Sequence, residues 1–285
     1  QLWCLEPDET SYNAVINACE KAGRTQCVLE LLQKMPLQAL KPDVISYSTA
    51  ISACEKSSDS NLALDLLQEM QHRRIPPSVI SYNATISACA KGRWSDLALQ
   101  LVHKMRQQGL KPDVITYNAV IAATGEAPEH ISLVFTLLAD MRHCKIQPNT
   151  ISYSAAISAC ERVGNSAAAL ELLQEMHRWS LQPNVISYNA AISACEKSGQ
   201  IQCALGLLDE MRHVSLQPSV ISYNAAISAF EKAGDCWAAL QLLMQMRQSD
   251  QEPNVISYNA AISVCEKARQ FDLAMKLLQE LWESG

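Results

Sequence analysis

The chain has 285 residues, of which 48% are hydrophobic and 18% charged, a composition typical of folded globular proteins. No apolar run approaches the roughly 20 residues that cross a bilayer, which excludes a membrane-spanning helix and predicts a soluble chain. The formal net charge of −6 disfavours nucleic-acid binding on composition alone, because such binding depends on neutralising phosphates.

An internal repeat with a period of 35 residues dominates the sequence. The stretch VISYNAAISACEK at 185–197 returns as VISYNAAISAFEK at 220–232 and as VISYNAAISVCEK at 255–267. A fixed period of this length predicts a repeat architecture. We number the places of each repeat from its first residue, so that Val185 occupies place 1. Residues 1–8 are interpreted as the tail of a preceding repeat, and eight repeats cover 9–43, 44–78, 79–113, 114–149, 150–184, 185–219, 220–254 and 255–285.

Each repeat predicts two helices. In the repeat from 185, apolar residues at places 4, 7, 8 and 11 follow helical spacing and predict a buried stripe. A polar turn at 197–200 comes next, followed by a second stripe at places 20, 21, 24 and 27. Pro218 then stops the second helix. Because one such hairpin cannot bury both stripes alone, we expect an all-α fold, a right-handed α-solenoid of about eight stacked helical hairpins.

The first helix distinguishes between two families of helical repeat. Tetratricopeptide repeats have about 34 residues, with a tryptophan, a glycine and a second aromatic residue along the first helix. Here that helix is YNAAISACEK, with no glycine and a single aromatic residue. Together with a second helix such as CALGLLDEMRHVSLQPS, it resembles the pentatricopeptide repeat family, in its P-type arrays, over residues 9–285. The resemblance implies an RNA-binding solenoid that takes single-stranded RNA along its concave groove, one nucleotide per repeat, with the 5′ end at the amino-terminal repeat.

Two places in each repeat are candidates for reading a base. Places 5, 9 and 12 or 13 share a helix face distinct from the buried stripe, so we expect them to line the groove. Place 5 holds an amide or hydroxyl, which suits a base edge, and the last place holds a small polar residue, which suits helix entry equally well. The resemblance implies that the two places read one base jointly. The candidate base-reading residues are Asn13, Asp43, Ser48, Ser78, Asn83, Asp113, Asn118, Asn149, Ser154, Asn184, Asn189, Ser219, Asn224, Asn254 and Asn259.

The family's pairing rule implies the target 5′-U-A-U-Y-A-C-Y-3′, where Y is a pyrimidine and the second base is the weakest match. Asparagine with aspartate implies uracil in repeats 1 and 3, and asparagine with serine implies cytosine in repeat 6. Two asparagines imply either pyrimidine in repeats 4 and 7. Ser154 with Asn184 implies adenine, whereas Ser48 with Ser78 is a weaker match to adenine. The partner of Asn259, which would read one more pyrimidine, lies beyond residue 285.

The repeat at 114–149 departs from the pattern. It has 36 residues, places Gly125 and Pro128 in the turn, and lacks the cysteine of place 11. Glu126 stands where the other repeats have a cation. We therefore expect a local kink or a weaker nucleotide contact there.

Two further places are candidates for RNA contact. The resemblance implies that place 2 packs flat against the neighbouring bases, although a hydrophobic staple at the helix entrance explains an apolar residue there as well. Place 13 is basic in seven repeats and is expected to contact phosphate, although a cation in the last turn also complements the helix dipole. The adjacent glutamate dilutes this positive field in six repeats. The base-packing residues are Ile45, Ile80, Ile115, Ile151, Ile186, Ile221 and Ile256, and the phosphate-contacting residues are Lys21, Lys56, Lys91, Arg162, Lys197, Lys232 and Lys267.

The remaining reactive side chains follow the repeat and indicate no catalytic site. All eight tyrosines occupy place 4, in the buried stripe, so we expect core packing in preference to base stacking. Six of the eleven cysteines occupy place 11 in separate repeats, which predicts small buried residues in a reducing compartment. The six histidines have no ligand spacing, and no nucleophile with a base or glycine-rich phosphate loop occurs. We therefore expect no enzymatic activity, no metal site and no cofactor.

The sequence thus predicts a protein that binds single-stranded RNA and acts by occupying it, in RNA processing, stability or translation. Its family resemblance implies a plastid or a mitochondrion, with protein co-factors as further partners, although no targeting segment is visible after Gln1. The alternative is a scaffold that holds a peptide in the groove, as tetratricopeptide arrays do. The near-identity of repeats 6 to 8 also permits a consensus-like array without a natural target.

Overall fold

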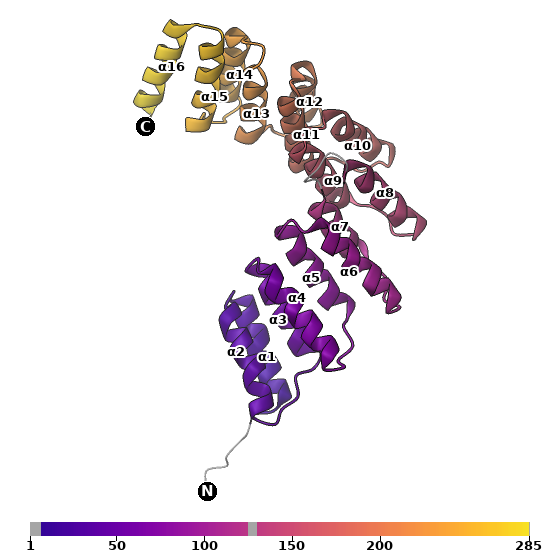
Figure 1. The fold of residues 1–285 in the computed structure, drawn as a ribbon. Helices are drawn as coiled ribbons and strands as arrows, with labels where there is room; N and C mark the ends of the chain where they lie inside the picture. Colours follow the sequence, from indigo (N-terminus) through magenta and orange to yellow (C-terminus); the bar gives the residue numbers. More distant parts are fainter. Residues whose placement is uncertain (1–6, 125–129, 285) are drawn as a thin grey trace. The chain divides into compact units, whose positions relative to one another are not determined.

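A computed structural model describes residues 7–124 and 130–284, and these residues form sixteen α-helices and no strand (Figure 1). In this part of the chain no helix is both long and apolar enough to cross a membrane. The helices are α1 (Glu9–Lys21), α2 (Thr25–Leu37), α3 (Val44–Lys56), α4 (Ser60–His72), α5 (Val79–Lys91), α6 (Ser95–Gln107), α7 (Val114–Ala123), α8 (His130–His143), α9 (Thr150–Arg162), α10 (Ser166–Arg178), α11 (Val185–Ser198), α12 (Ile201–His213), α13 (Val220–Ala229), α14 (Cys236–Gln248), α15 (Val255–Lys267) and α16 (Phe271–Ser284).

The odd-numbered helices are the first helices of the repeats, and each begins at place 1. The residue before it, at the last place of the preceding repeat, is the N-cap: its side chain accepts a hydrogen bond from the backbone amide at place 3. In several repeats the place 3 hydroxyl also accepts from the N-cap amide, which completes a capping box. In α11 the left-handed Gly199, with φ of 73°, ends the helix. Local sequence signals therefore determine where each first helix begins.

The helices form two compact units. Among the described residues, the first unit comprises 7–124 and 140–147, and the second comprises 130–139 and 148–284. In the first unit, α1, α3, α5 and α7 pack successively against one another, and α2, α4 and α6 each pack between two of them. In the second unit, α9, α11, α13 and α15 do the same, with α10, α12 and α14 packed between them and α16 against α15. Within each unit the first helices thus form one layer and the second helices another.

The buried stripes follow the predicted spacing, with one correction. Places 4, 7, 8 and 11 of α11 are fully buried, as predicted. On α12, Ala204, Leu208 and Met211 are buried, but Leu205 at place 21 is only half-buried and Leu207 at place 23 is buried in its stead. The prediction for place 21 was wrong because three leucines stand within four residues, and the packing of α12 against α11 and α13 selects among them.

The tyrosine rings lie in the core, as predicted, in seven of the eight repeats. Tyr47, Tyr82, Tyr117, Tyr153, Tyr188, Tyr223 and Tyr258 are each at most 2% exposed, and Tyr12 is half-buried. Their hydroxyls bond polar side chains of the second helices; that of Tyr188 donates to Glu210 at 2.8 Å. The rings are therefore covered by protein and do not offer a face for base stacking.

Five of the six cysteines of place 11 are buried as well, and Cys19 is half-buried. Burial raises the pKa of the Cys54 and Cys160 thiols to about 12, and that of Cys89 and Cys195 to about 11. Because the folded pKa lies above the ordinary value near 9, each thiol adds stability below pH 9 that is lost as the pH rises toward the folded pKa. Cys144, in contrast, is exposed at the end of α8.

We expect a bulky thiol reagent at pH 8 to modify Cys144 at least a hundred times faster than Cys160. With a pKa of about 12, only about one Cys160 thiol in ten thousand is ionised at that pH, and burial also blocks access. Peptide mapping by mass spectrometry measures both rates, and Cys144→Ser should leave the rate at Cys160 unchanged. Equal rates in the native protein would contradict the burial of place 11, whereas equal rates in denaturant are expected.

Candidate nucleic-acid interface

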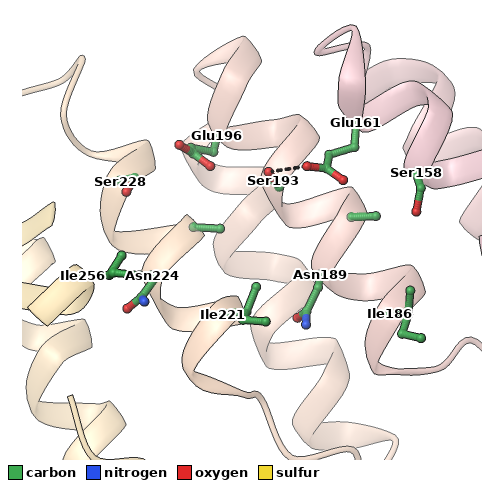
Figure 2. Close-up of a pocket in the computed structure, with 12 residues that line it drawn as sticks. Ser158, Glu161, Ile186, Asn189, Ser193, Glu196, Ile221, Asn224, Ser228 and Ile256 are labelled. Carbon is green, nitrogen blue, oxygen red and sulfur yellow. Dashed lines mark hydrogen bonds between the residues drawn. The ribbon is translucent and has the colours of Figure 1, made fainter. Parts of the chain in front are cut away.

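An open groove of about 510 Å³ runs across the first helices of the second unit (Figure 2). Its lining comes from the same places in successive repeats, namely places 2, 5, 6, 9 and 12 of α9, α11, α13 and α15. The helical spacing predicted this face for places 5, 9 and 12 or 13, and of the last two it is place 12 that lines the groove. In Figure 2, Ile186, Asn189, Ile221, Asn224 and Ile256 follow one another in a row, so that apolar and amide side chains alternate along the groove.

The first unit has a corresponding groove. Ile45 and Ile80 at place 2, Ser48 at place 5, and Ser52 at place 9 line it, together with Ser78 at a last place. The two grooves are therefore built from equivalent residues, although each lies within its own unit.

The isoleucines of place 2 are the most exposed large apolar side chains on the first helices. Their exposed fractions lie between 60% in Ile45 and 66% in Ile221. A hydrophobic staple would be covered by its own helix, so this exposure favours a role in contacting something that enters the groove. The other members, Ile80, Ile115, Ile151, Ile186 and Ile256, are exposed to the same degree.

The structure brings the predicted reading residues together in pairs. The Asn13 amide nitrogen donates to Asp43 at 3.3 Å, and that of Asn83 lies 3.1 and 3.2 Å from the two Asp113 carboxylate oxygens. Three further pairs, all in the second unit, lie within hydrogen-bond distance: Ser154 with Asn184 at 3.5 Å, Asn189 with Ser219 at 3.2 Å, and Asn224 with Asn254 at 3.5 Å.

Ser48 and Ser78 lie 3.3 Å apart in the first unit. Asn118 lies on α7 and Asn149 caps α9, in different units, and Asn259 lies on α15. The last place also serves helix entry, the other explanation for its small polar residues. In repeats 1 to 7 the residue at the last place is the N-cap of the first helix that follows. One side chain thus serves both the fold and the groove.

The Asp43 carboxylate stays ionised in this position. Burial alone would raise its pKa, but hydrogen bonds from the Ser46 amide and hydroxyl and from Asn13 lower it overall. An ionised carboxylate only accepts hydrogen bonds, so Asp43 is suited to a base that presents an N–H group.

Four of the basic residues of place 13 reach back to the preceding repeat. The Lys56 ammonium lies 2.7 Å from the Glu20 carboxylate, and that of Lys197 lies 3.2 Å from Glu161. Lys91 donates to the Glu55 carbonyl oxygen at 2.7 Å. Lys232 likewise donates to the carbonyl of Lys197 at 2.9 Å, whereas Lys21, Arg162 and Lys267 end α1, α9 and α15. These cations cap helix ends and screen the neighbouring glutamates. The sequence of a single repeat does not reveal these contacts, because they join neighbouring repeats.

The glutamate of place 12 lies on the predicted groove face, and Glu20, Glu161 and Glu196 line the grooves. Burial raises the pKa of Glu196, Lys197 lowers it, and the nearby Glu161 and Glu231 raise it further. The hydroxyl of place 3, which lies behind the reading pairs, escaped the sequence analysis. The only signal for it in the sequence is the constant serine or threonine at this place.

Within the described residues, the irregular repeat and the reactive side chains provide no metal site. Residues 125–129, which include the predicted kink and Glu126, lie outside the described residues. Among the described residues no group of three or more histidine, cysteine, aspartate or glutamate side chains could hold a metal ion. The cysteines described are free thiols.

The chain is similar to several solved structures. One is the pentatricopeptide repeat protein PPR10 from maize. The match covers 99% of this chain and 41% of the PPR10 chain, with 26% sequence identity and a TM-score of 0.72. The match to PPR10 in complex with an 18-nt psaJ RNA element covers 99% of this chain and 46% of that chain, with 22% sequence identity and a TM-score of 0.63. The match to the PPR domain of Arabidopsis thaliana protein-only RNase P 1 in complex with tRNA covers 59% of this chain and 89% of that domain, with 19% sequence identity and a TM-score of 0.50. The chain thus spans less than half the length of the maize chains.

Family models cover most of the sequence. The pentatricopeptide repeat domain matches residues 4–57, 30–92, 65–127, 136–198 and 206–268, the PPR repeat family matches 183–225, and the PPR repeat matches 256–285. No curated protein matched. The predicted all-α solenoid fold of helical hairpins is confirmed by the likeness to PPR10. On these matches, the chain belongs to the pentatricopeptide repeat family.

Proposed function

We propose that this chain binds single-stranded RNA along the grooves of its first helices and reads one nucleotide per repeat. The observation that carries the proposal is the pairing of place 5 with the last place, which lie within hydrogen-bond distance in six repeats. The exposed isoleucines between these pairs would pack on the base faces. The similarity to PPR10, whose structure was also solved with RNA, supports RNA as the ligand.

The pairs support the target 5′-U-A-U-Y-A-C-Y-3′, with the amino-terminal repeat on the 5′ side. The chain would act by occupancy, shielding or remodelling a transcript or guiding another protein to it. The family resemblance supports a plastid or mitochondrial transcript and a role in its processing, stability or translation.

A basic peptide is the second candidate ligand, because Glu161 and Glu196 line the same groove as the reading pairs. Carboxylates disfavour a polyanion but favour lysine or arginine side chains. Dependence on salt separates the two ligands. Release of counterions from up to seven phosphates sets a limit of roughly minus five on the log–log slope for a single strand.

Fluorescence anisotropy with labelled 5′-UAUCACC tests the proposal directly. We expect this RNA to bind at least about tenfold more tightly than a scrambled strand or the DNA version, with affinity that falls steeply with salt. Equal binding of target and scramble would contradict the base assignments. Absence of RNA binding, together with binding of a basic peptide, would replace RNA by a protein ligand.

A matched pair of variants locates the interface. Ile221 on α13 and Trp237 on α14 are each 66% exposed, but only Ile221 lines the groove. We expect Ile221→Ala to weaken RNA binding about fivefold or more, because the bases would cover apolar surface of the isoleucine and each buried CH₂ group contributes about 0.8 kcal/mol. Trp237→Ala should leave the affinity unchanged. The reverse result would place the RNA on the second helices.

A further inference from the structure

A buried hydroxyl stands at place 3 behind each reading pair. Place 3 in repeats 2 to 8 is serine or threonine, and every one of these side chains is completely buried. They are Ser46, Ser81, Thr116, Ser152, Ser187, Ser222 and Ser257. Since each hydroxyl oxygen can accept from the N-cap amide of its own helix, its hydrogen remains to be donated elsewhere.

In three repeats that hydrogen is donated to the asparagine of the preceding repeat. The Ser46 hydroxyl lies 2.6 Å from the Asn13 amide oxygen, and the Thr116 hydroxyl lies 2.6 Å from that of Asn83. Ser222 makes the same bond to Asn189. With the amide oxygen held from behind, the amide nitrogen of the asparagine is directed toward the residue at the last place and into the groove.

The partner at the last place decides how much the hydroxyl matters. In repeat 3 a reversed Asn83 amide would direct its oxygen at the Asp113 carboxylate, so both neighbours enforce one orientation. In repeat 6 the partner is Ser219, whose hydroxyl can donate or accept and therefore tolerates either orientation of Asn189. Only Ser222, which already accepts from the Ser219 amide at 2.9 Å, then selects the orientation.

Repeat 7 provides an internal contrast. Ser257 donates to its N-cap Asn254 at 3.1 Å, much as the Ser222 hydroxyl lies 3.1 Å from that of its N-cap Ser219. The buried amide oxygen of Asn224, however, has no hydrogen-bond partner among the described residues. Ser257 nevertheless accepts from the Asn254 amide at 3.1 Å, just as Ser222 does from Ser219. Hence the two serines contribute alike to capping but differ in whether they hold the reading asparagine.

We infer that a place 3 hydroxyl that bonds the place 5 asparagine of the preceding repeat, as those of Ser46, Thr116 and Ser222 do, is a positioning residue for base specificity. It holds that asparagine so that N–H groups are presented to a base. The inference rests on the proposed RNA function. A held amide favours bases with an acceptor at that point, such as cytosine in repeat 6. A free amide can reverse and accept from a base donor, so repeat 7 discriminates less.

The test compares Ser222→Ala, Ser222→Thr and Ser257→Ala in the full chain. Binding constants are measured for RNAs with cytosine or adenine at the sixth nucleotide, and with cytosine or adenine at the seventh. We expect Ser222→Ala to lower the preference for cytosine at the sixth nucleotide about tenfold. Ser222→Thr keeps the hydroxyl, as Thr116 does in repeat 4, and should keep the preference. Ser257→Ala removes an equivalent capping bond and should leave the preference at the seventh nucleotide unchanged.

An unchanged preference in Ser222→Ala would overturn the inference. Equal losses of preference in Ser222→Ala and Ser257→Ala would overturn it too, because the loss of a capping bond would then explain both. The side-chain amide of Asn189 provides a second measurement, by NMR of the free protein labelled with ¹⁵N-asparagine. Its heteronuclear NOE should fall in Ser222→Ala and not in Ser222→Thr. If the wild-type chain shows no base preference, the proposed function is contradicted, and this NOE still supports the held amide if it falls and overturns it if it does not.

Discussion

The substitution Ser219→Asp is expected to change the preferred sixth nucleotide from cytosine to uracil. The new side chain would face Asn189 as Asp113 faces Asn83, and it can cap α13 as Asp113 caps α7. A carboxylate accepts from the N3–H of uracil but faces the lone pair on N3 of cytosine. We expect a change in discrimination of about 1–3 kcal/mol, measured as the ratio of binding constants for the two RNAs.

The reciprocal change and an acidic cap outside the groove provide the controls. Asp113→Ser should change the preferred third nucleotide from uracil to cytosine. Asp235→Ser alters a residue that caps α14 through the same kind of bond, to the Ala238 amide at 3.1 Å, but lies on a second helix. It should alter stability slightly and leave base preference unchanged. If Ser219→Asp keeps cytosine as the preferred base, the last place does not read it.

Removal of a buried tyrosine ring is expected to have the largest effect on stability. Tyr223 is completely buried, and its hydroxyl accepts from Arg212 at 3.0 Å and lies 3.0 Å from the Ser249 hydroxyl. Tyr223→Ala should lower the free energy of unfolding by about 3–5 kcal/mol, because it leaves a cavity in the core. Tyr223→Phe, which loses only the hydrogen bonds, should cost about 1 kcal/mol.

Urea denaturation followed by circular dichroism measures both variants. The phenylalanine variant should bind RNA as the wild type does, since the ring lies in the core. A stable alanine variant that has lost RNA binding would instead place the ring against the bases, contrary to its burial.

The sequence predicts the first helices well because several independent signals agree there. Places 4, 7, 8 and 11 form a single apolar stripe, and a capping residue precedes it. The second helix is less determined, because Leu205, Leu207 and Leu208 offer three apolar choices and packing against the neighbouring helices selects two. Periodicity specifies a face only to within about one place.

The candidate site was predictable in its residues but not in its contacts. Helical spacing brings places 5 and 9 to one face, whereas the pairing with the last place was implied only by the family resemblance. The bond of Lys197 to Glu161 and that of Ser222 to Asn189 join residues 36 and 33 apart. Such bonds depend on how one repeat stacks on the next, which the pattern of a single repeat does not contain.

The bond from Ser222 to Asn189 also bears on how such arrays can be recombined. Cutting the chain at residue 219 would carry Asn189 and Ser219 together into a new array but leave Ser222 behind. In a transplanted cassette, the place 3 residue behind the reading pair would then come from the host sequence that follows it. Cassettes grafted into hosts with serine or threonine at place 3 should keep their base preference, whereas in hosts with alanine there the base preference should be weaker. Extending the cassette by three residues, to Ser222, would make it self-sufficient.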